Sequence, residues 1–215
     1  MPENMRYKLI AFDMDGTLTE EESCWGILHR HFGTHEAAGK NLGAYERGEI
    51  DYLEFMRRDI ALWKPVPTLE QVRRVLTPHR LAPNVEQVVG EIHRRGYQTV
   101  VITGGLDLLA EEVARRLGIR YVFSNGLAAD EKGHLTGEGI FRVEPRFKHE
   151  VLAGLVGELG ISLQQCVAVG DSKYDANFLK HAGLGVAIGV DSELVRVADV
   201  VIHDFEHLPQ LLDYL

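Results

Sequence analysis

The sequence predicts an α/β fold, in which a doubly wound parallel sheet carries an inserted helical domain and a β-hairpin. The first observation behind this prediction is that short apolar runs alternate with helical patterns along most of the chain. The second is that the runs are apolar without a break, which is typical of strands buried on both faces of a parallel sheet. The third is that the alternation stops between residues 22 and 78, where helical patterns follow one another without a good strand.

Five apolar runs are the predicted strands of the sheet, and four helical patterns are the predicted helices around it. The runs cover residues 7–12, 98–103, 166–169, 184–188 and 200–202. The helical patterns cover residues 85–95, 106–117, 147–159 and 174–182. Strands that alternate with helices in this way favour a parallel sheet.

The interruption between residues 22 and 78 predicts a separate helical unit. Residues 52–63, for example, have a helical pattern, and four prolines mark the return to alternating strands and helices. We therefore expect a helical domain over residues 21–79, inserted into a core domain that consists of residues 1–20 and 80–215.

A second interruption, over residues 122–143, predicts the β-hairpin. Lys132-Gly133 is a turn signal that lies between two short extended pieces. Like residues 22–78, this segment breaks the alternation of strand and helix.

Composition limits the classes of partner. The length of 215 residues suits one large domain or a core with a small accessory domain. The net charge of -9 argues against nucleic acids and anionic membranes, although a bound cation would still allow an anionic substrate. No apolar run approaches the roughly 18 residues of a membrane span, and the start of the chain lacks the layout of a signal peptide. We expect a cytoplasmic protein that is a monomer or a homodimer.

Carboxylates follow two of the predicted strands. Asp13 and Asp15 come directly after the first run, and Asp171 comes after the run 166–169, with Asp175 one helical turn further on. Ligands of doubly wound sheets bind at the carboxyl ends of the strands, so we expect these acids to lie together. Carboxylates at such short range repel unless a cation lies among them, and hard oxygen ligands suit Mg²⁺.

Groups suited to an anion accompany these acids. Thr103 offers a hydroxyl at the end of the second run, and Gly104 lets a backbone N–H approach an anion closely. Lys148 opens the helical pattern after the hairpin and supplies a positive charge. A metal, an anion-binding loop, a fixed charge and a nucleophile are what phosphoryl transfer needs, and Asp13 is a candidate nucleophile.

Each of these groups has a simpler interpretation when it is taken alone. Asp13 to Gly16 is compatible with a turn, and Thr103-Gly104-Gly105 with a plain strand-to-helix connection. Lys148 alone is compatible with a solvated surface lysine, and Asp171 with a helix start. Their occurrence together and in order, each beside a predicted strand end or helix start, favours a common site.

At this point the sequence resembles the haloacid dehalogenase superfamily over nearly its whole length. The inserted helical domain resembles the small helical cap of that superfamily. The pattern is most similar to that of phosphoserine phosphatases, especially over residues 100–107 and 167–179. The four superfamily motifs correspond, in order, to residues 13–18, to Thr103, to Lys148, and to Gly170-Asp171-Ser172 with Asp175.

The resemblance implies hydrolysis of a small phosphomonoester through an aspartyl-phosphate. Asp13 would attack phosphorus, while Asp15 would protonate the leaving oxygen and later activate water. Thr103, the Gly104 N–H and Lys148 would hold the phosphoryl oxygens.

The resemblance also implies a Mg²⁺ site. The side chains of Asp13 and Asp171 and the backbone carbonyl of Asp15 would bind the ion. Asp175 would lie in or next to this group of ligands.

Substrate choice is expected to lie in the cap. The resemblance places Glu22 where phosphoserine phosphatases have an acid for the substrate amine. It places Asp59 where they have an arginine for the substrate carboxylate, with Arg57 and Arg58 as the neighbouring candidates. An aspartate would repel a carboxylate, so if Asp59 lines the pocket we expect a neutral or cationic substrate.

Two other functions remain compatible with the sequence. A phosphotransferase or phosphomutase would pass the phosphoryl group from Asp13 to an acceptor alcohol. A non-catalytic binding protein on the same fold would be expected to have lost a motif residue, and here all are present.

Overall fold

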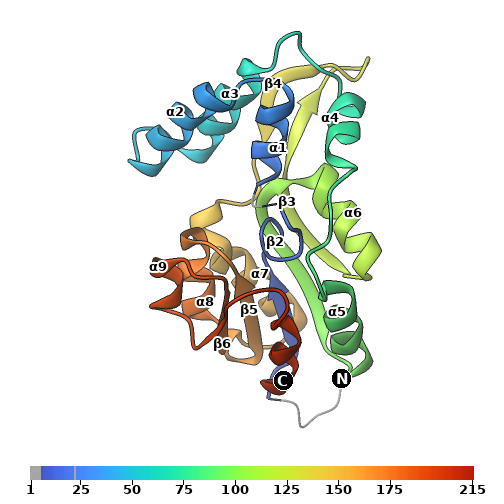
Figure 1. Ribbon diagram of the computed structural model, residues 1–215, viewed down its shortest axis with the longest axis vertical. Coiled ribbons are helices and arrows are strands. Elements are labelled where there is room, and N and C mark those ends of the chain that lie inside the picture. Colours follow the sequence, from blue (N-terminus) through green and yellow to red (C-terminus); the bar gives the residue numbers. More distant parts are fainter. Residues whose placement is uncertain (1–5, 22) are drawn as a thin grey trace.

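The computed structural model describes residues 6–21 and 23–215, which form a seven-stranded sheet with the strand order β4-β3-β2-β1-β5-β6-β7 (Figure 1). All neighbouring strands are parallel except β3 and β4, which are antiparallel. The predicted α/β class with a hairpin is therefore confirmed. The strands are β1 (Leu9–Phe12), β2 (Gln98–Leu106), β3 (Tyr121–Ala129), β4 (Leu135–Ile140), β5 (Cys166–Gly170), β6 (Leu184–Ile188) and β7 (Val200–Ile202).

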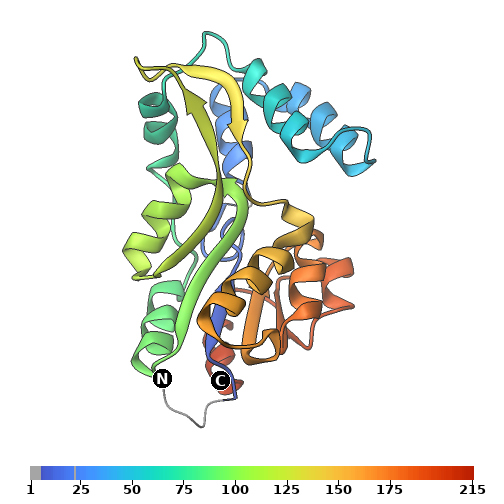
Figure 2. The ribbon, with the colours of Figure 1, turned by 180° about the vertical axis from the view of Figure 1, so that it is seen from behind.

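Helices cover both faces of the sheet (Figure 2). Side chains alternate across β1, so Ile10 and Phe12 join one apolar cluster with α5 and α6, while Leu9 and Ala11 join a second cluster with α7, α8 and α9. Burial on both faces explains why the strands are apolar without a break. The helices of these layers are α5 (Val85–Arg94), α6 (Asp107–Leu117), α7 (Lys148–Leu159), α8 (Ala176–His181) and α9 (Ser192–Val195).

Four further helices, which we call the insert helices, lie between β1 and α5. In Figure 1, α2 and α3 extend away from the sheet, beyond the end of β2. Several of these helices begin with side-chain caps: for example, Asp51 caps α3 by accepting from the Glu54 N–H, and Thr68 and Gln71 form a capping box at α4. The division of the chain into a core and a cap domain stays a prediction. The insert helices are α1 (Cys24–His31), α2 (His35–Glu46), α3 (Tyr52–Leu62) and α4 (Leu69–Leu76).

Strand β3 belongs to two parts of the sheet. Its first half pairs with β2 in parallel, and its second half pairs with β4 in the hairpin, which rises beside the insert helices (Figure 2). A side chain at Gly139 in β4 would collide with Met56 in α3, so the two elements are in close contact. The hairpin turn also bonds to the start of α4, because the Leu69 N–H donates to the Gly133 carbonyl at 2.9 Å.

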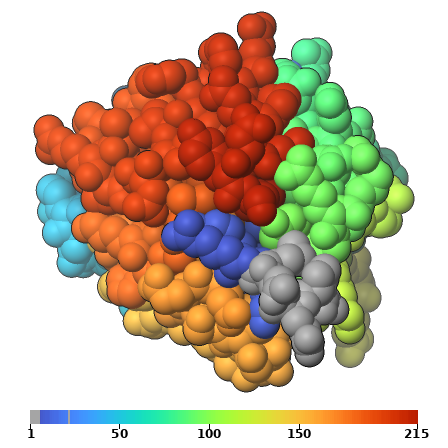
Figure 3. All heavy atoms as spheres, turned by 90° about the horizontal axis from the view of Figure 1, so that it is seen from below, coloured from blue at the N-terminus to red at the C-terminus, as the bar shows by residue number. Residues whose placement is uncertain are grey.

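The C-terminal segment packs beside the core (Figure 3). It forms a 3₁₀ turn at Leu208–Asp213, and the Arg95 side chain at the end of α5 donates to the Leu212 carbonyl at 2.7 Å. In the part of the chain that the structure describes, we find no helix with the length and apolar character needed to cross a bilayer.

Candidate active site

The predicted polar residues meet at the carboxyl ends of three neighbouring strands, β2, β1 and β5. Asp13 follows β1 directly, Thr103 lies in β2, and Asp171 follows β5. Asp13 extends the sheet by one bond, since its N–H donates to the Val169 carbonyl at 2.9 Å. Adjacent parallel strands therefore bring residues from three distant parts of the sequence to one edge.

A cluster of carboxylates surrounds the ammonium group of Lys148. One carboxylate oxygen each from Asp13, Asp171 and Asp175 lies within 4.8 Å of the other two. The Lys148 Nζ lies 2.5 Å from an oxygen of Asp13 and 2.6 Å from one of Asp175. Asp13, Asp175 and Lys148 are buried. The Thr17 hydroxyl donates to Asp171 at 3.3 Å.

One lysine does not compensate three carboxylates, and the pKa values of Asp13 and Asp171 reflect burial together with this excess of negative charge. Burial raises the pKa of Asp13 to about 7, although Lys148 opposes the shift. Burial and the neighbouring Asp13 raise the pKa of Asp171 to about 9. Burial alone would lower the pKa of Lys148, but Asp13 and Asp175 raise it above its ordinary value. Buried oxygen ligands with surplus negative charge fit a hard divalent cation.

Asp15 lies apart from this cluster and faces the insert helices. One carboxylate oxygen accepts the Cys24 N–H at 3.1 Å, at the first turn of α1. The other oxygen is buried and has no hydrogen-bond partner among residues 6–21 and 23–215. Burial raises the pKa of Asp15 to about 6, and the bond from Cys24 limits the shift. A carboxyl group with a pKa in this range can both donate and accept a proton near neutral pH.

Thr103, Gly104 and Gly105 form a bulge in β2. Ile102 pairs with Phe123, and the next pair is Leu106 with Asn125. Between these two pairs β2 therefore has two more residues than β3. The Gly105 N–H donates to the Thr103 hydroxyl at 2.9 Å.

The shape of the bulge requires glycine. A Cβ at Gly104 would lie 2.5 Å from Pro145, and a Cβ at Gly105 would lie 2.8 Å from Met14. The bulge therefore presents a compact stretch of backbone beside Asp13, as an anion-binding loop requires.

Sequence reasoning missed Asn125, which holds this bulge in place. Its side-chain NH₂ donates to the carbonyls of Gly104 at 3.1 Å and Val143 at 2.9 Å. Its side-chain oxygen accepts the N–H groups of Arg142 at 2.7 Å and Val143 at 2.9 Å. In the sequence, Asn125-Gly126 has the appearance of a turn, so no local signal indicates a buried asparagine within a strand.

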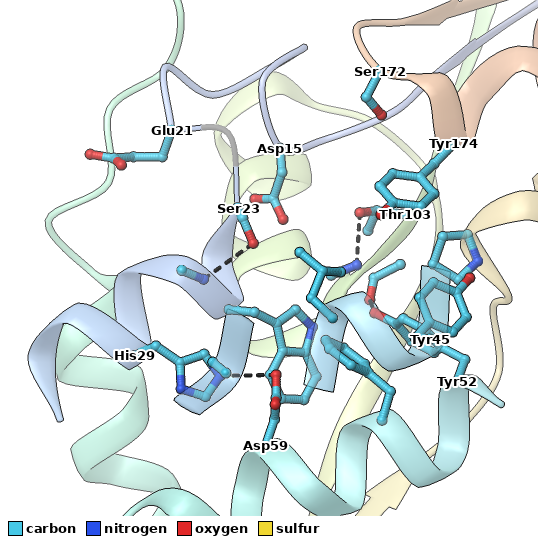
Figure 4. A pocket seen from close by; sticks show the side chains of 18 of the residues that line it. Asp15, Glu21, Ser23, His29, Tyr45, Tyr52, Asp59, Thr103, Ser172 and Tyr174 are labelled. Atoms are coloured by element: carbon cyan, nitrogen blue, oxygen red, sulfur yellow. Dashed lines mark hydrogen bonds and ion pairs between the residues drawn. The ribbon is translucent and has the colours of Figure 1, made fainter. Parts of the chain in front are cut away.

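A cavity of about 720 Å³ connects these core residues with the insert helices (Figure 4). Asp15 and Thr103 lie on the core side of it, and His29 and Asp59 lie on the opposite side, among the insert helices. Asp13 and Lys148 also line the cavity.

Contacts between the insert helices and the core border the cavity. The Tyr52 hydroxyl donates to the Gly104 carbonyl at 2.7 Å. The Tyr174 hydroxyl donates to Glu46 at 2.7 Å, and the Arg146 guanidinium lies 4.3 Å from the centre of the Tyr45 ring. The insert helices therefore contact the carboxyl edge of the sheet.

Of the substrate-binding residues predicted for the insert, none that the structure describes is found in the lining of the cavity. Glu22 lies outside the described residues. Arg57 forms an exposed ion pair with Glu138 at 2.6 Å, and Arg58 forms one with Glu54 at 2.8 Å. The structure places neither arginine in the lining of the cavity, because both lie on the exposed side of α3.

Asp59, in contrast, lies on the buried side of α3 and lines the cavity. Its two oxygens accept hydrogen bonds from His29 at 2.9 Å and from Asn41 at 2.7 Å. Asp59, which replaces the arginine expected from the resemblance, is thus part of a buried polar network.

Comparisons with known proteins agree with this geometry. A family model described as haloacid dehalogenase-like hydrolase matches residues 7–183. A phosphoserine phosphatase of Methanocaldococcus jannaschii is 31% identical over 209 residues, which cover 97% of each chain. One of Lactococcus lactis is 32% identical over 83% of this chain and 82% of its own.

Solved structures of phosphoserine phosphatases are also similar to this chain. A phospho-aspartyl intermediate analogue of phosphoserine phosphatase superposes with a TM-score of 0.82 at 30% identity, covering 98% of this chain and 99% of the other. A substrate-bound phosphoserine phosphatase complex superposes with a TM-score of 0.82 at 29% identity, covering 99% of this chain and all of the other.

Proposed function

Since the chain belongs to the haloacid dehalogenase-like hydrolases and is a phosphatase, we propose that it hydrolyses a small phosphomonoester with Mg²⁺ through phosphorylation of Asp13. The observation that carries this proposal is that Asp13 belongs to the acidic cluster and lines the same cavity as Thr103 in the bulge. A nucleophile, a cation site and an anion-binding loop thereby share one end of the cavity.

Three residues are proposed to hold the metal ion. They are the side chains of Asp13 and Asp171 and the backbone carbonyl of Asp15. Asp175 bonds to Lys148 and keeps it between the carboxylates. When bound, Mg²⁺ supplies positive charge that balances the carboxylates and the phosphoryl oxygens.

The first half of the reaction transfers the phosphoryl group to the enzyme. A carboxylate oxygen of Asp13 attacks phosphorus as the bond to the leaving oxygen breaks. The carboxyl group of Asp15 donates its proton to that oxygen, so that a neutral alcohol leaves. Thr103, the Gly104 N–H and Lys148 bind the phosphoryl oxygens and keep the group in line for attack.

The second half releases phosphate. Asp15 is now a carboxylate and takes a proton from water, whose oxygen attacks phosphorus and frees Asp13. The products are inorganic phosphate and the original enzyme, with the proton back on Asp15. The pKa of Asp15, raised by burial to about 6, suits both directions of proton transfer.

Phosphate release is the test of this proposal. We expect Mg²⁺-dependent release of phosphate from p-nitrophenyl phosphate by the wild-type protein, and none by Asp13→Asn, which replaces the nucleophile with a group of the same shape. Circular dichroism provides the control that the variant is folded. Retention of more than a few per cent of activity in Asp13→Asn would show that another group is the nucleophile.

A further inference from the structure

The part of the cavity formed by the insert helices is mainly aromatic and apolar. Trp25, Tyr45, Tyr52 and Phe55 line it, and their rings pack on one another. The ring centres of Trp25 and Phe55 lie 5.8 Å apart, and those of Tyr52 and Phe55 lie 5.2 Å apart. Leu42 adds an aliphatic side chain that is 40% exposed. We call these five residues the apolar wall.

Positive charge is scarce around this wall. Among residues 6–21 and 23–215, Lys148 and Arg30 are the two lysine or arginine side chains that line the cavity. Lys148 is held between Asp13 and Asp175 at the phosphoryl end. Arg30 forms an ion pair with Glu21 at 2.7 Å on the surface. A carboxylate on the leaving group would therefore find, among the described residues, no lysine or arginine that both lines the cavity and is unpaired.

Of the acids that the structure describes, three line the cavity away from the phosphoryl end. Glu21 pairs with Arg30 at 2.7 Å and Glu20 lies 3.9 Å from Arg80, whereas Asp59 is buried.

The Trp63 indole N–H donates to His29 Nδ1 at 3.3 Å, so the other nitrogen, Nε2, carries the proton that it donates to Asp59. Asp59 is 1% exposed, and each of its oxygens already accepts a bond, one from His29 and one from Asn41. This carboxylate repels an anionic leaving group, and its engaged oxygens leave little for a substrate ammonium group to bind.

We infer that the leaving group of the substrate is an uncharged apolar alcohol, aromatic or aliphatic, that packs against the apolar wall. This inference rests on the proposed function, because it concerns the part of the same substrate that lies beyond the phosphoryl group. The cavity volume of about 720 Å³ falls within the ordinary range of about 300 to 1,000 Å³ for sites that enclose organic ligands. Burial of apolar surface, rather than ion pairing, is then the source of substrate selectivity.

Three esters of primary alcohols test the inference, because their leaving groups carry, in turn, no charged group, an ammonium with a carboxylate, and a quaternary ammonium. They are 2-phenylethyl phosphate, O-phospho-L-serine and phosphocholine. We expect kcat/KM for 2-phenylethyl phosphate to exceed each of the other two by about tenfold or more, the range in which small apolar differences are discriminated. Equal or higher kcat/KM for phosphoserine or phosphocholine would overturn the inference.

A pair of variants at Leu42 tests the wall itself. Leu42 is partly exposed, so its replacement does not disturb the core. We expect Leu42→Arg, which adds a positive charge, to raise the ratio of kcat/KM for phosphoserine to that for 2-phenylethyl phosphate about fivefold, relative to the uncharged control Leu42→Gln. The same ratio in both variants would mean that the leaving group does not meet this wall, which would overturn the inference.

The inference and the proposed function would be contradicted by different results. A protein that cleaves p-nitrophenyl phosphate with Mg²⁺ but prefers phosphoserine contradicts the inference alone. A protein that releases phosphate from no ester with Mg²⁺ contradicts both.

Discussion

The hydroxyl of Tyr52, in helix α3, donates a 2.7 Å hydrogen bond to the carbonyl of Gly104, in the bulge of β2. The bond joins the insert helices to the loop that is proposed to bind phosphoryl oxygens. Burial raises the pKa of Tyr52 well above its ordinary value, so the phenol stays protonated and remains a donor. The helices proposed to select the substrate and the loop proposed to bind the phosphoryl group are thus in contact at this bond.

We expect Tyr52→Phe to lower kcat/KM while the protein stays folded. The ring is kept, so the loss is that of one hydrogen bond, about 1 kcal/mol, or roughly fivefold in kcat/KM. Steady-state kinetics with p-nitrophenyl phosphate and a thermal melt would measure both quantities. An unchanged kcat/KM would show that the bulge keeps its position without this bond.

Asp15→Asn should separate the two halves of the reaction. p-Nitrophenolate leaves without a proton, so we expect a rapid burst of one p-nitrophenolate per enzyme. Steady-state turnover should then fall about 10² to 10⁴-fold, because asparagine does not take a proton from water. Stopped-flow absorbance measures both phases. If the burst slows as much as the steady state, Asp15 has a different role from the one proposed.

Mg²⁺ binding and pH should be linked. The folded-state pKa of Asp13 is raised to about 7 and that of Asp171 to about 9, so the folded protein binds more protons than the unfolded chain between about pH 4 and pH 9. The free energy of unfolding of the metal-free protein should therefore fall as pH rises through this range. Mg²⁺ binds the deprotonated carboxylates, so it should raise the melting temperature more at about pH 8 than at about pH 5.5.

Differential scanning fluorimetry with and without Mg²⁺ measures this linkage. Asp171→Asn is the matched control, because it removes the carboxylate with the larger pKa shift and keeps its shape. We expect a much smaller Mg²⁺ effect in this variant at both pH values. A Mg²⁺ effect that is the same at both pH values in the wild-type protein would contradict the proposed site.

Asn125→Ala should destabilise the protein and also impair catalysis. The variant loses four hydrogen bonds to buried or partly buried backbone groups, for which we expect a loss of about 3 kcal/mol in the free energy of unfolding. Urea denaturation measures this loss. Since the bulge loses its support at Gly104, kcat should fall in the protein that remains folded. A stable variant with normal kcat would show that backbone pairing alone holds the bulge.

The sheet could be predicted from the sequence because its strands are buried on both faces. Each run of apolar residues corresponds to a strand, and the predicted edges differ by a few residues. The bulge in β2 was not predicted, because the apolar run ends at Thr103 and pairing resumes only at Leu106. The alignment of Leu106 with Asn125 depends on tertiary contacts that a single strand does not encode.

The core residues of the site could be placed together from their positions after strands, whereas the insert residues required the structure. The buried positions of α3 are Tyr52, Phe55, Met56, Asp59 and Ile60, which follow the spacing of one helical face. This periodicity was available in the sequence and separates Asp59 from its two arginine neighbours. The partners of Asp59 were not available, because His29 and Asn41 come from two other helices.

The central place of β1 has a consequence for how the protein folds. Residue Leu9 pairs with Gln98 on one side and with Cys166 on the other, so β1 forms its bonds with segments far along the chain. Such long-range pairing costs loop entropy and makes folding slow. During synthesis, the first strand is made early and completes its pairing only after β5 has emerged. Asp13 and Asp171, which follow these two strands, therefore meet only after β1 and β5 have paired, so the site does not form before residue 171 has been synthesised.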